Sequence, residues 1–192
     1  MKIVKYPHPA LRRVSRPLTA IDQTVHANAA RMLELMYEAK GLGLAANQVA
    51  LPYRMIVLNP TGDPQQKDRE GVYLNPVVLE RKGTVEDDEG CLSLPGLFAK
   101  VRRAKTVKVQ AYNLKGEAVE AVVSDLEARL WQHEIDHLDG VLFIDKLGTI
   151  GKLASRKALQ EFEQEYLKAQ ERGEIPPDAD IQKMLDALEG AA

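Results

Sequence analysis

Two histidines and a glutamate in the second half of the chain have the spacing of a metal-binding helix. Residues 133–137 have the sequence H-E-I-D-H. Positions four residues apart lie on one face of a helix, so His133 and His137 can reach one metal ion. Glu134 then stands beside the ion, where its carboxylate can accept a proton from water. The alternative is a surface helix with two solvated histidines. The pattern is rare in a chain with four histidines, and we interpret it as a metal site.

A catalytic metal site usually has three protein ligands, and two residues are candidates for the third. Cys91 is the only cysteine and lies in the segment E-G-C-L-S, which we expect to be a loop between strands. Its thiolate would complete a tetrahedral Cys/His₂ site with one open position. The other candidate is Glu161 on a later predicted helix, which would indicate a zinc peptidase. An isolated cysteine is usually a small buried apolar residue, but the histidine pair favours Cys91.

A glycine-rich segment upstream could place backbone close to a bound molecule. Residues 41–48 have the sequence G-L-G-L-A-A-N-Q. The pattern is similar to a dinucleotide-binding fingerprint, but that fingerprint must follow a strand, and this segment follows a predicted helix. We therefore reject that interpretation. Small residues permit close approach of a substrate, and Gln48 supplies an amide donor. A tight connection without a chemical role is the alternative.

Length and composition limit the class of protein. The 192 residues have the length of one domain, with 45% hydrophobic and 28% charged residues, as in ordinary globular proteins. The 26 basic and 28 acidic residues nearly cancel, which argues against a dedicated nucleic-acid-binding protein. No apolar run approaches the ~20 residues that span a bilayer, and no signal-peptide pattern is present. With a single cysteine, we expect a soluble protein of the reducing cytoplasm without a membrane partner.

Hydrophobic periodicity predicts the elements that position these residues. Helices are expected over residues 22–40, 125–139, 152–171 and 181–188. Strands are expected over residues 55–58, 72–74, 77–79, 101–112 and 118–123, and a surface loop over 60–71. Asp22 is the expected N-cap of the first helix, and Gly41 is expected at the C′ position, where a left-handed glycine would end it. Leu153 and Tyr166 belong to the expected apolar stripe of the third helix.

The order of these elements predicts the α+β class. Strands lie in the middle of the chain with helices around them, and few strand–helix–strand crossovers are present. We expect small antiparallel sheets packed around a central metal-binding helix, with a C-terminal helix. Residues 1–171 are expected to form a single catalytic domain, and residues 172–192 a short C-terminal extension with one further helix.

The three segments together resemble the signature motifs of the peptide deformylases. G-L-G-L-A-A-N-Q, E-G-C-L-S and Q-H-E-I-D-H occur in the order found in that family. The resemblance spans about residues 1–170, including the C-terminal helix typical of the bacterial type. It implies a metallohydrolase that removes the formyl group from the N-terminal formyl-methionine of nascent polypeptides and releases formate. It also implies one divalent ion, Fe²⁺ in the cell, with Zn²⁺ or Ni²⁺ able to occupy the same site. The ligand types alone favour zinc.

The same resemblance implies roles for individual residues. The metal ligands would be Cys91, His133 and His137, with Glu134 as general base and acid. The Gln48 amide and the backbone N–H of Leu92 would stabilise the oxyanion, and the backbone of Gly43 would bind the peptide. We expect the methionine pocket to be lined by Leu42, Leu126 and Leu130. Residues 86–88 are all acidic, whereas some family members carry an apolar residue in this stretch. The difference affects the shape and charge expected for the rim of the pocket.

Neighbouring residues are expected to support the site or to contact partners. Glu89 is the candidate to orient an imidazole or to pair with Arg103. Asp136 and Trp131 are expected to have packing roles. A basic stripe on the third helix could contact the ribosome, or it could be a solvated face. This stripe consists of Lys152, Arg156, Lys157 and Lys168. A non-catalytic domain that binds nascent chains or ribosomes is a further alternative, although intact Glu134 and Gln48 argue against it.

Overall fold

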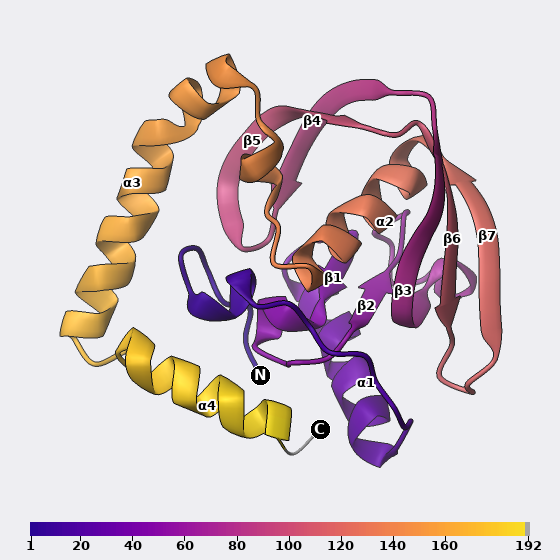
Figure 1. Cartoon of the computed structure of the whole chain (residues 1–192), viewed down its shortest axis with the longest axis horizontal. Coiled ribbons are helices and arrows are strands. Elements are labelled where there is room, and N and C mark those ends of the chain that lie inside the picture. The colour runs from indigo at the N-terminus through magenta and orange to yellow at the C-terminus, as the bar shows by residue number, and fades with distance from the viewer. Residues whose placement is uncertain (191–192) are drawn as a thin grey trace.

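The computed structural model describes residues 1–190 and has the predicted α+β architecture (Figure 1). The helices are α1 (Gln23–Glu38), α2 (Asp125–Leu138), α3 (Thr149–Glu171) and α4 (Asp178–Gly190), with short 3₁₀ turns that include η1 (Pro9–Arg12) and η2 (Ala46–Val49). The strands are β1 (Gly43–Ala45), β2 (Met55–Leu58), β3 (Gly71–Lys82), β4 (Val85–Cys91), β5 (Leu94–Arg103), β6 (Thr106–Tyr112) and β7 (Ala118–Ser124).

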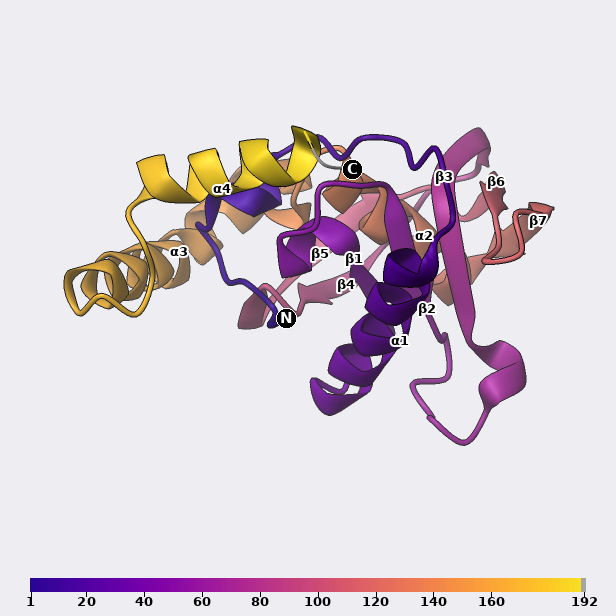
Figure 2. The ribbon, with the colours of Figure 1, turned by 90° about the horizontal axis from the view of Figure 1, so that it is seen from below.

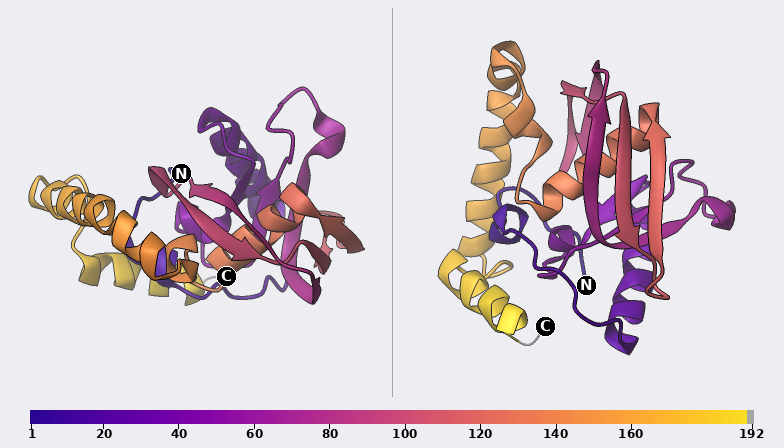
Figure 3. Two further views of the ribbon diagram at one scale, coloured as in Figure 1. Left: turned by 90° about the horizontal axis from the view of Figure 1, so that it is seen from above. Right: turned by 45° about the vertical axis from the view of Figure 1, so that its right-hand side comes forward.

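Helix α2 lies between two antiparallel sheets. Strands of the larger sheet follow the order β1-β2-β3-β6-β7, and β4 and β5 form a separate two-stranded sheet. Helix α2 runs along one face of the larger sheet (Figure 3). Trp131 of α2 is buried in the core there, with its ring centroid 4.3 Å from that of Tyr73. The opposite side of α2 directs Arg129 and His133 toward β4. The prediction of small sheets around a central helix is confirmed.

Both ends of α2 contact segments that are distant in the sequence. At the start, the Asp125 amide donates to the Lys105 carbonyl at 2.8 Å, which ties the helix to the beginning of β6. At the end, Gly140 has a φ of 72°, and a Cβ there would lie 2.6 Å from the Arg12 carbonyl oxygen. Only glycine tolerates both conditions. The helix therefore ends where the sequence predicts.

Helix α1 begins as predicted but ends differently. The Asp22 carboxylate accepts a hydrogen bond from the Val25 amide at 2.8 Å, as expected of an N-cap. At the other end Lys40, not Gly41, adopts the left-handed conformation, with a φ of 56°. The Gly41 amide donates to the Met36 carbonyl at 2.8 Å, which completes a Schellman turn. The prediction that Gly41 is the left-handed residue is therefore wrong.

Gly41 is required for close packing instead. A Cβ at this position would lie 2.6 Å from Cδ1 of Leu92. The absence of a side chain lets the glycine-rich segment approach the β4–β5 turn, which contains Leu92 and directly follows Cys91.

The strands around Cys91 differ most from the prediction. Residues 101–112 are not one strand, because the chain leaves the small sheet after Arg103 and joins the large sheet at Thr106. The side-chain amide of Gln132 on α2 causes this break, since it binds both the amide and the carbonyl of Ala104 at 3.0 Å. Cys91 is the last residue of β4 and not part of a loop. The two predicted pieces 72–74 and 77–79 form one strand across an irregularity after Leu74.

The C-terminal helices return to the N-terminal segment. Helix α3 extends along one side of the molecule, and α4 folds back beside the N-terminal residues (Figures 1 and 2). Ile181 and Leu185 of α4 are buried, and Arg13 Nε lies 2.6 Å from a carboxylate oxygen of Glu189. Leu153 is 71% exposed, so its assignment to an apolar stripe is wrong. None of the helices in the described residues combines the length and apolar character that a membrane span needs.

Candidate active site

Three predicted ligands from two elements meet at one point. Cys91 ends β4, while His133 and His137 lie one turn apart on α2. His137 Nε2 is 3.2 Å from Cys91 Sγ and 3.2 Å from His133 Nε2, and the three ligand atoms lie within 4.8 Å of one another. Glu161 is exposed on α3, with its carboxylate 3.9 Å from the Lys157 amine. The structure therefore supports Cys91 as the third ligand and not Glu161.

The residues present fit a divalent cation. Metal–sulfur and metal–nitrogen bonds of about 2.3 and 2.0–2.1 Å in a tetrahedron place ligand atoms roughly 3.3–3.6 Å apart. The two 3.2 Å separations are close to this range. Burial, together with the neighbouring His133, lowers the pKa of His137 well below its usual value. A neutral imidazole has the free nitrogen lone pair that a metal ligand needs.

Glu89 fixes the orientation of His133. Its carboxylate lies 2.5 Å from His133 Nδ1, which directs Nε2 of the same ring toward Cys91 and His137. Arg103 binds both carboxylate oxygens of Glu89, at 2.8 and 2.5 Å. Burial raises the pKa of Glu89, but these hydrogen bonds outweigh it and leave the pKa well below its usual range. Glu89 thus orients the His133 imidazole and also pairs with Arg103, the two roles considered for it from the sequence.

Two further charges complete this network, and one of them is not predicted from the sequence. Arg103 also pairs with Asp136 at 2.5 Å, which gives Asp136 the packing role expected of it. Arg129 is 7% exposed and donates to Glu89 at 2.8 Å and to the Val101 carbonyl at 3.0 Å. It therefore holds α2 to the small sheet. The sequence indicates this role of Arg129 only through its position four residues before His133, which places both side chains on one helix face.

Arg129→Met should weaken the hold on the metal. Loss of the bond to Glu89 leaves the carboxylate with one arginine partner and loosens the link between α2 and β5. Contacts of this kind are worth about 10–100-fold in metal affinity, so we expect release of the ion to a chelator to be roughly ten-fold faster. Arg102→Met is the matched control, because Arg102 is exposed on β5. Equal release rates for the two variants would contradict this role.

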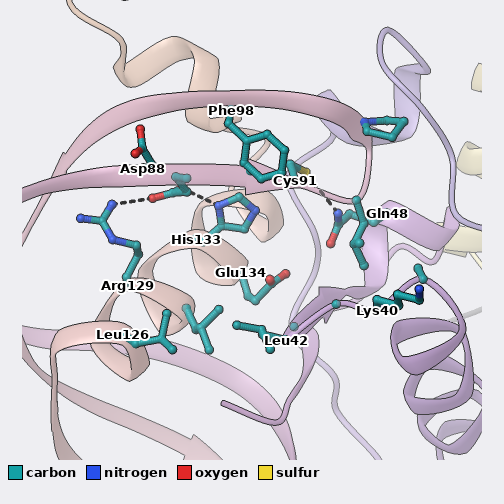
Figure 4. A pocket seen from close by; sticks show the side chains of 18 of the residues that line it. Lys40, Leu42, Gln48, Asp88, Cys91, Phe98, Leu126, Arg129, His133 and Glu134 are labelled. Atoms are coloured by element: carbon teal, nitrogen blue, oxygen red, sulfur yellow. Dashed lines mark hydrogen bonds and ion pairs between the residues drawn. The ribbon is translucent and has the colours of Figure 1, made fainter. Parts of the chain in front are cut away.

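Glu134 points into the space beside the ligands (Figure 4). Its side chain is buried, and its Oε2 has no hydrogen-bond partner among residues 1–190. Burial raises the pKa of this carboxyl to about 7. A carboxyl group with such a pKa can both accept and return a proton near neutral pH. The edge strand β1 passes directly against it, since a Cβ at Gly43 would lie 2.5 Å from Glu134 Oε1.

Gln48 lies on the other side of the cysteine. Its carbonyl oxygen accepts from the Ala45 amide at 2.8 Å, which fixes the orientation of the side chain. Its amide nitrogen donates to Ser93 Oγ at 3.1 Å and lies 3.5 Å from Cys91 Sγ (Figure 4). The backbone of Leu92 follows Cys91 directly. The structure thus brings the Gln48 amide, one of the two predicted oxyanion donors, next to the ligand cluster, and Leu92 lines the same cavity.

A cavity of about 480 Å³ opens beside these groups. Its walls are the glycine-rich segment 41–43, the β4–β5 hairpin and one face of α2. The predicted residues Leu42, Leu126 and Leu130 all line it, although Leu126 is 50% exposed. The lining also includes residues that the sequence interpretation did not place there, namely Lys40, Phe98 and Arg129. Of the acidic run 86–88, only Asp88 belongs to the lining.

Comparison with known proteins agrees with this geometry. The family model described as polypeptide deformylase matches residues 1–152, a range that contains all three motifs. This chain belongs to the peptide deformylase family. A peptide deformylase from Rhodopirellula baltica is 44% identical over 181 residues, which cover 94% of this chain and 90% of the relative. One from Nitrosococcus oceani is 39% identical over 84% of this chain and 95% of the relative.

Solved peptide deformylases share the fold. The Plasmodium falciparum enzyme has 38% identity and a TM-score of 0.84, with 87% of this chain and 98% of that chain covered. Peptide deformylase 1B from Arabidopsis thaliana, solved with an inhibitor, has 37% identity and a TM-score of 0.84, with coverage of 92% and 96%. The family membership and the enzyme class that the motifs predict are thereby confirmed for this deformylase.

Proposed function

We propose that this deformylase removes the formyl group from the N-terminal formyl-methionine of nascent polypeptides and releases formate. One observation carries the proposal: a Cys/His₂ cluster and a buried carboxyl group lie together at the side of a largely apolar cavity that an edge strand borders. Such a cavity suits an apolar side chain, and the free edge of β1 suits an extended peptide.

The proposed cofactor is one divalent cation held by Cys91, His133 and His137. We propose Fe²⁺ as the ion in the cell, following the family resemblance, and Zn²⁺ or Ni²⁺ as ions that can replace it. When bound, the cation supplies Lewis-acid chemistry, which lowers the pKa of water and polarises a carbonyl oxygen. Metal analysis of protein purified without oxygen tests the choice of ion.

Glu134 moves the proton in the proposed reaction. Its carboxylate accepts a proton from water as the water oxygen adds to the formyl carbon. The carbon–nitrogen bond then breaks, and the same carboxyl group returns the proton to the departing amine nitrogen. The products are formate and a peptide with a free amino terminus. Its burial and the free Oε2 support this role.

Gln48 and Leu92 are proposed to stabilise the oxygen that gains negative charge. The Ala45 amide holds the Gln48 carbonyl, so the amide nitrogen is directed toward the Cys91 side of the cavity. The backbone N–H of Leu92 is the second proposed donor. Groups that are held in place before the reaction stabilise the developing charge without reorganisation, and removal of one donor typically costs about 10²–10³ in turnover.

The substrate peptide is proposed to lie along β1. Within residues 1–190 this strand pairs with β2 alone, so its other edge is available to the backbone of an extended chain. The Gly43 backbone would bind that chain, and the methionine side chain would lie among Leu42, Leu126 and Leu130. This arrangement presents the formyl carbon to Glu134.

Gly43→Ala should lower activity without loss of metal. The added Cβ would lie 2.5 Å from Glu134 Oε1 and 2.9 Å from Leu58 Cδ2, so the carboxylate or the strand must move. Because displacement of about 1 Å can cost 10²-fold in rate, we expect kcat to fall roughly 100-fold. Gly148→Ala is the control, since its Cβ meets nothing within 4 Å. Full activity of Gly43→Ala would exclude a close approach of β1 to the reacting groups.

We propose that the protein acts in the cytoplasm and that residues 1–171 form the catalytic unit, with residues 172–192 as an extension. We also propose a transient ribosome contact through the basic stripe Lys152, Arg156, Lys157 and Lys168. Co-sedimentation with ribosomes at low and high salt tests the contact, because a charge-mediated complex weakens as salt rises.

The decisive assay is the release of formate from a formyl-Met peptide. Protein purified without oxygen and analysed for metal should release one formate per new amino terminus. Cleavage of internal peptide bonds with no formate release would favour a peptidase and contradict the proposal.

A further inference from the structure

A second cavity lies between the N-terminal segment and the C-terminal part of α3. Its volume is about 320 Å³, at the lower end of the roughly 300–1,000 Å³ found for small-molecule pockets. Residues from the range 2–8 form one wall, and residues from the range 162–176 form the other. None of these residues lines the cavity beside the ligand cluster. The proposed reaction therefore makes no use of the second cavity.

The walls of the second cavity are largely apolar. Their apolar residues are Ile3, Val4, Phe162, Ala169, Ile175 and Pro176. The rings of Tyr6 and Tyr166 also line the cavity, and both hydroxyl groups already have acceptors. Tyr6 donates to a carboxylate oxygen of Glu163 at 2.8 Å. Tyr166 donates to Asp178 at 2.6 Å. The two rings therefore contribute apolar surface to the cavity.

The charged groups of this lining leave an excess of positive charge. Arg172 is paired with Glu174 at 2.7 Å and with Glu165 at 2.9 Å. Lys2 and Lys5 are exposed and form no ion pair within residues 1–190. An ammonium group on a flexible stem can reach an anion while the stem covers apolar surface. The lining is therefore complementary to a ligand with a negative charge.

His8 adds a neutral hydrogen-bond donor to the same cavity. Its Nδ1 accepts from the Ala10 amide at 3.2 Å, so the proton of the neutral ring is on Nε2. Burial lowers the pKa of His8, which favours the neutral ring. In the described part of the chain Nε2 has no hydrogen-bond partner, and it can therefore donate to an acceptor atom of a ligand.

We propose that the second cavity binds a small apolar carboxylate, with its apolar body against α3 and its carboxylate near Lys2, Lys5 and His8. Burial of the apolar body removes surface of both partners from water. Hydrogen bonds from ammonium groups to a carboxylate are stronger than those between neutral groups, and they discriminate against a neutral ligand of the same shape. This binding site goes beyond the proposed function, because none of its residues takes part in the reaction.

The test compares three compounds that share one apolar body and differ in charge. They are 3-phenylpropionate, 3-phenylpropanamide and 3-phenylpropylamine, each added to the zinc-loaded protein. The readout is the imidazole proton resonance of His8, which comparison with His8→Gln identifies. We expect 3-phenylpropionate to shift this resonance with a dissociation constant below about 1 mM. The amide should bind roughly ten-fold more weakly, and the amine should cause no shift.

A double charge reversal tests the role of the two lysines. In Lys2→Glu/Lys5→Glu the preference for 3-phenylpropionate over the amide should disappear. Lys152→Glu/Lys157→Glu is the matched control, because it changes the net charge equally at two lysines that do not line the cavity. This control should keep the ten-fold preference of the wild type.

A cavity-filling substitution tests the location of the site. Ala169→Phe should abolish the shift by 3-phenylpropionate, because the added ring occupies the space among the apolar residues. Ala154→Phe is the control, since Ala154 is exposed on the same helix and does not line the cavity. Thermal melting of both variants shows whether the fold is kept. If Ala169→Phe is unfolded, the charge-reversal pair decides.

The result that would overturn this inference is a His8 resonance that 3-phenylpropionate leaves unchanged in the wild type. Equal affinities of the wild type for the carboxylate and the amide would also overturn it. The same holds if Lys2→Glu/Lys5→Glu, or a folded Ala169→Phe, binds 3-phenylpropionate as the wild type does.

Discussion

Replacement of Glu134 with glutamine should reduce deformylation about 10²–10⁴-fold while the metal stays bound. Glutamine has nearly the same shape as glutamate but cannot accept a proton from water, and general acid–base catalysis contributes about that factor. Because Glu134 is not among the clustered ligand atoms, its replacement leaves them in place. The measurement is kcat for formate release, with metal content determined on the same sample.

Glu161→Gln is the matched control for this prediction. Glu161 is exposed on α3 and was the candidate ligand of a peptidase site. We expect this variant to keep both its metal and its activity. If Glu161→Gln loses metal, or if Glu134→Gln remains within ten-fold of the wild type, the assignment of the proton-transfer group is wrong.

Cys91→Ser should lower the affinity for the cation by at least ~100-fold. Replacement of a residue that only hydrogen-bonds to a ligand typically lowers metal affinity about 10–100-fold, so the loss of a ligand itself should cost more. A serine hydroxyl stays protonated at neutral pH and is a poor ligand for a soft site. The change in volume is small and Cys91 is only half-buried, so the fold should persist. Equilibrium dialysis against a chelator of known affinity measures the effect.

A comparison of thermal melting separates loss of metal from loss of structure. Apo forms of the wild type and Cys91→Ser should melt at similar temperatures, and added zinc should stabilise only the wild type. A variant that binds one ion per chain with wild-type affinity would show that the sulfur is not a ligand.

The part of the site on α2 could be predicted because helical spacing determines it. His133 and His137 share a face at any helix orientation, and Gly140 marks the end of the helix in the sequence. Cys91 could be assigned only through its chemistry and the family resemblance. Its strand was not predicted because residues 86–89 are all acidic, and a small exposed sheet lacks the apolar alternation that signals a strand.

Other features depend on contacts between distant segments. The break between β5 and β6 follows from the Gln132 amide, and no pattern near residue 104 indicates it. Buried Arg129 has partners on β4 and β5, so its role became visible only once the hairpin was placed. Lys40 adopts a left-handed conformation beside a glycine, and the sequence favours the glycine for that role. Gly41 is needed instead for its close approach to Leu92.

X-ray absorption of the zinc-loaded protein tests the central claim most directly, since it reports the atoms bound to the ion. Coordination by Cys91, His133 and His137 predicts one sulfur at about 2.3 Å and two imidazole nitrogens at about 2.0–2.1 Å, with one further light atom. The sulfur signal should disappear in Cys91→Ser. A wild-type spectrum with only nitrogen and oxygen neighbours would contradict the account.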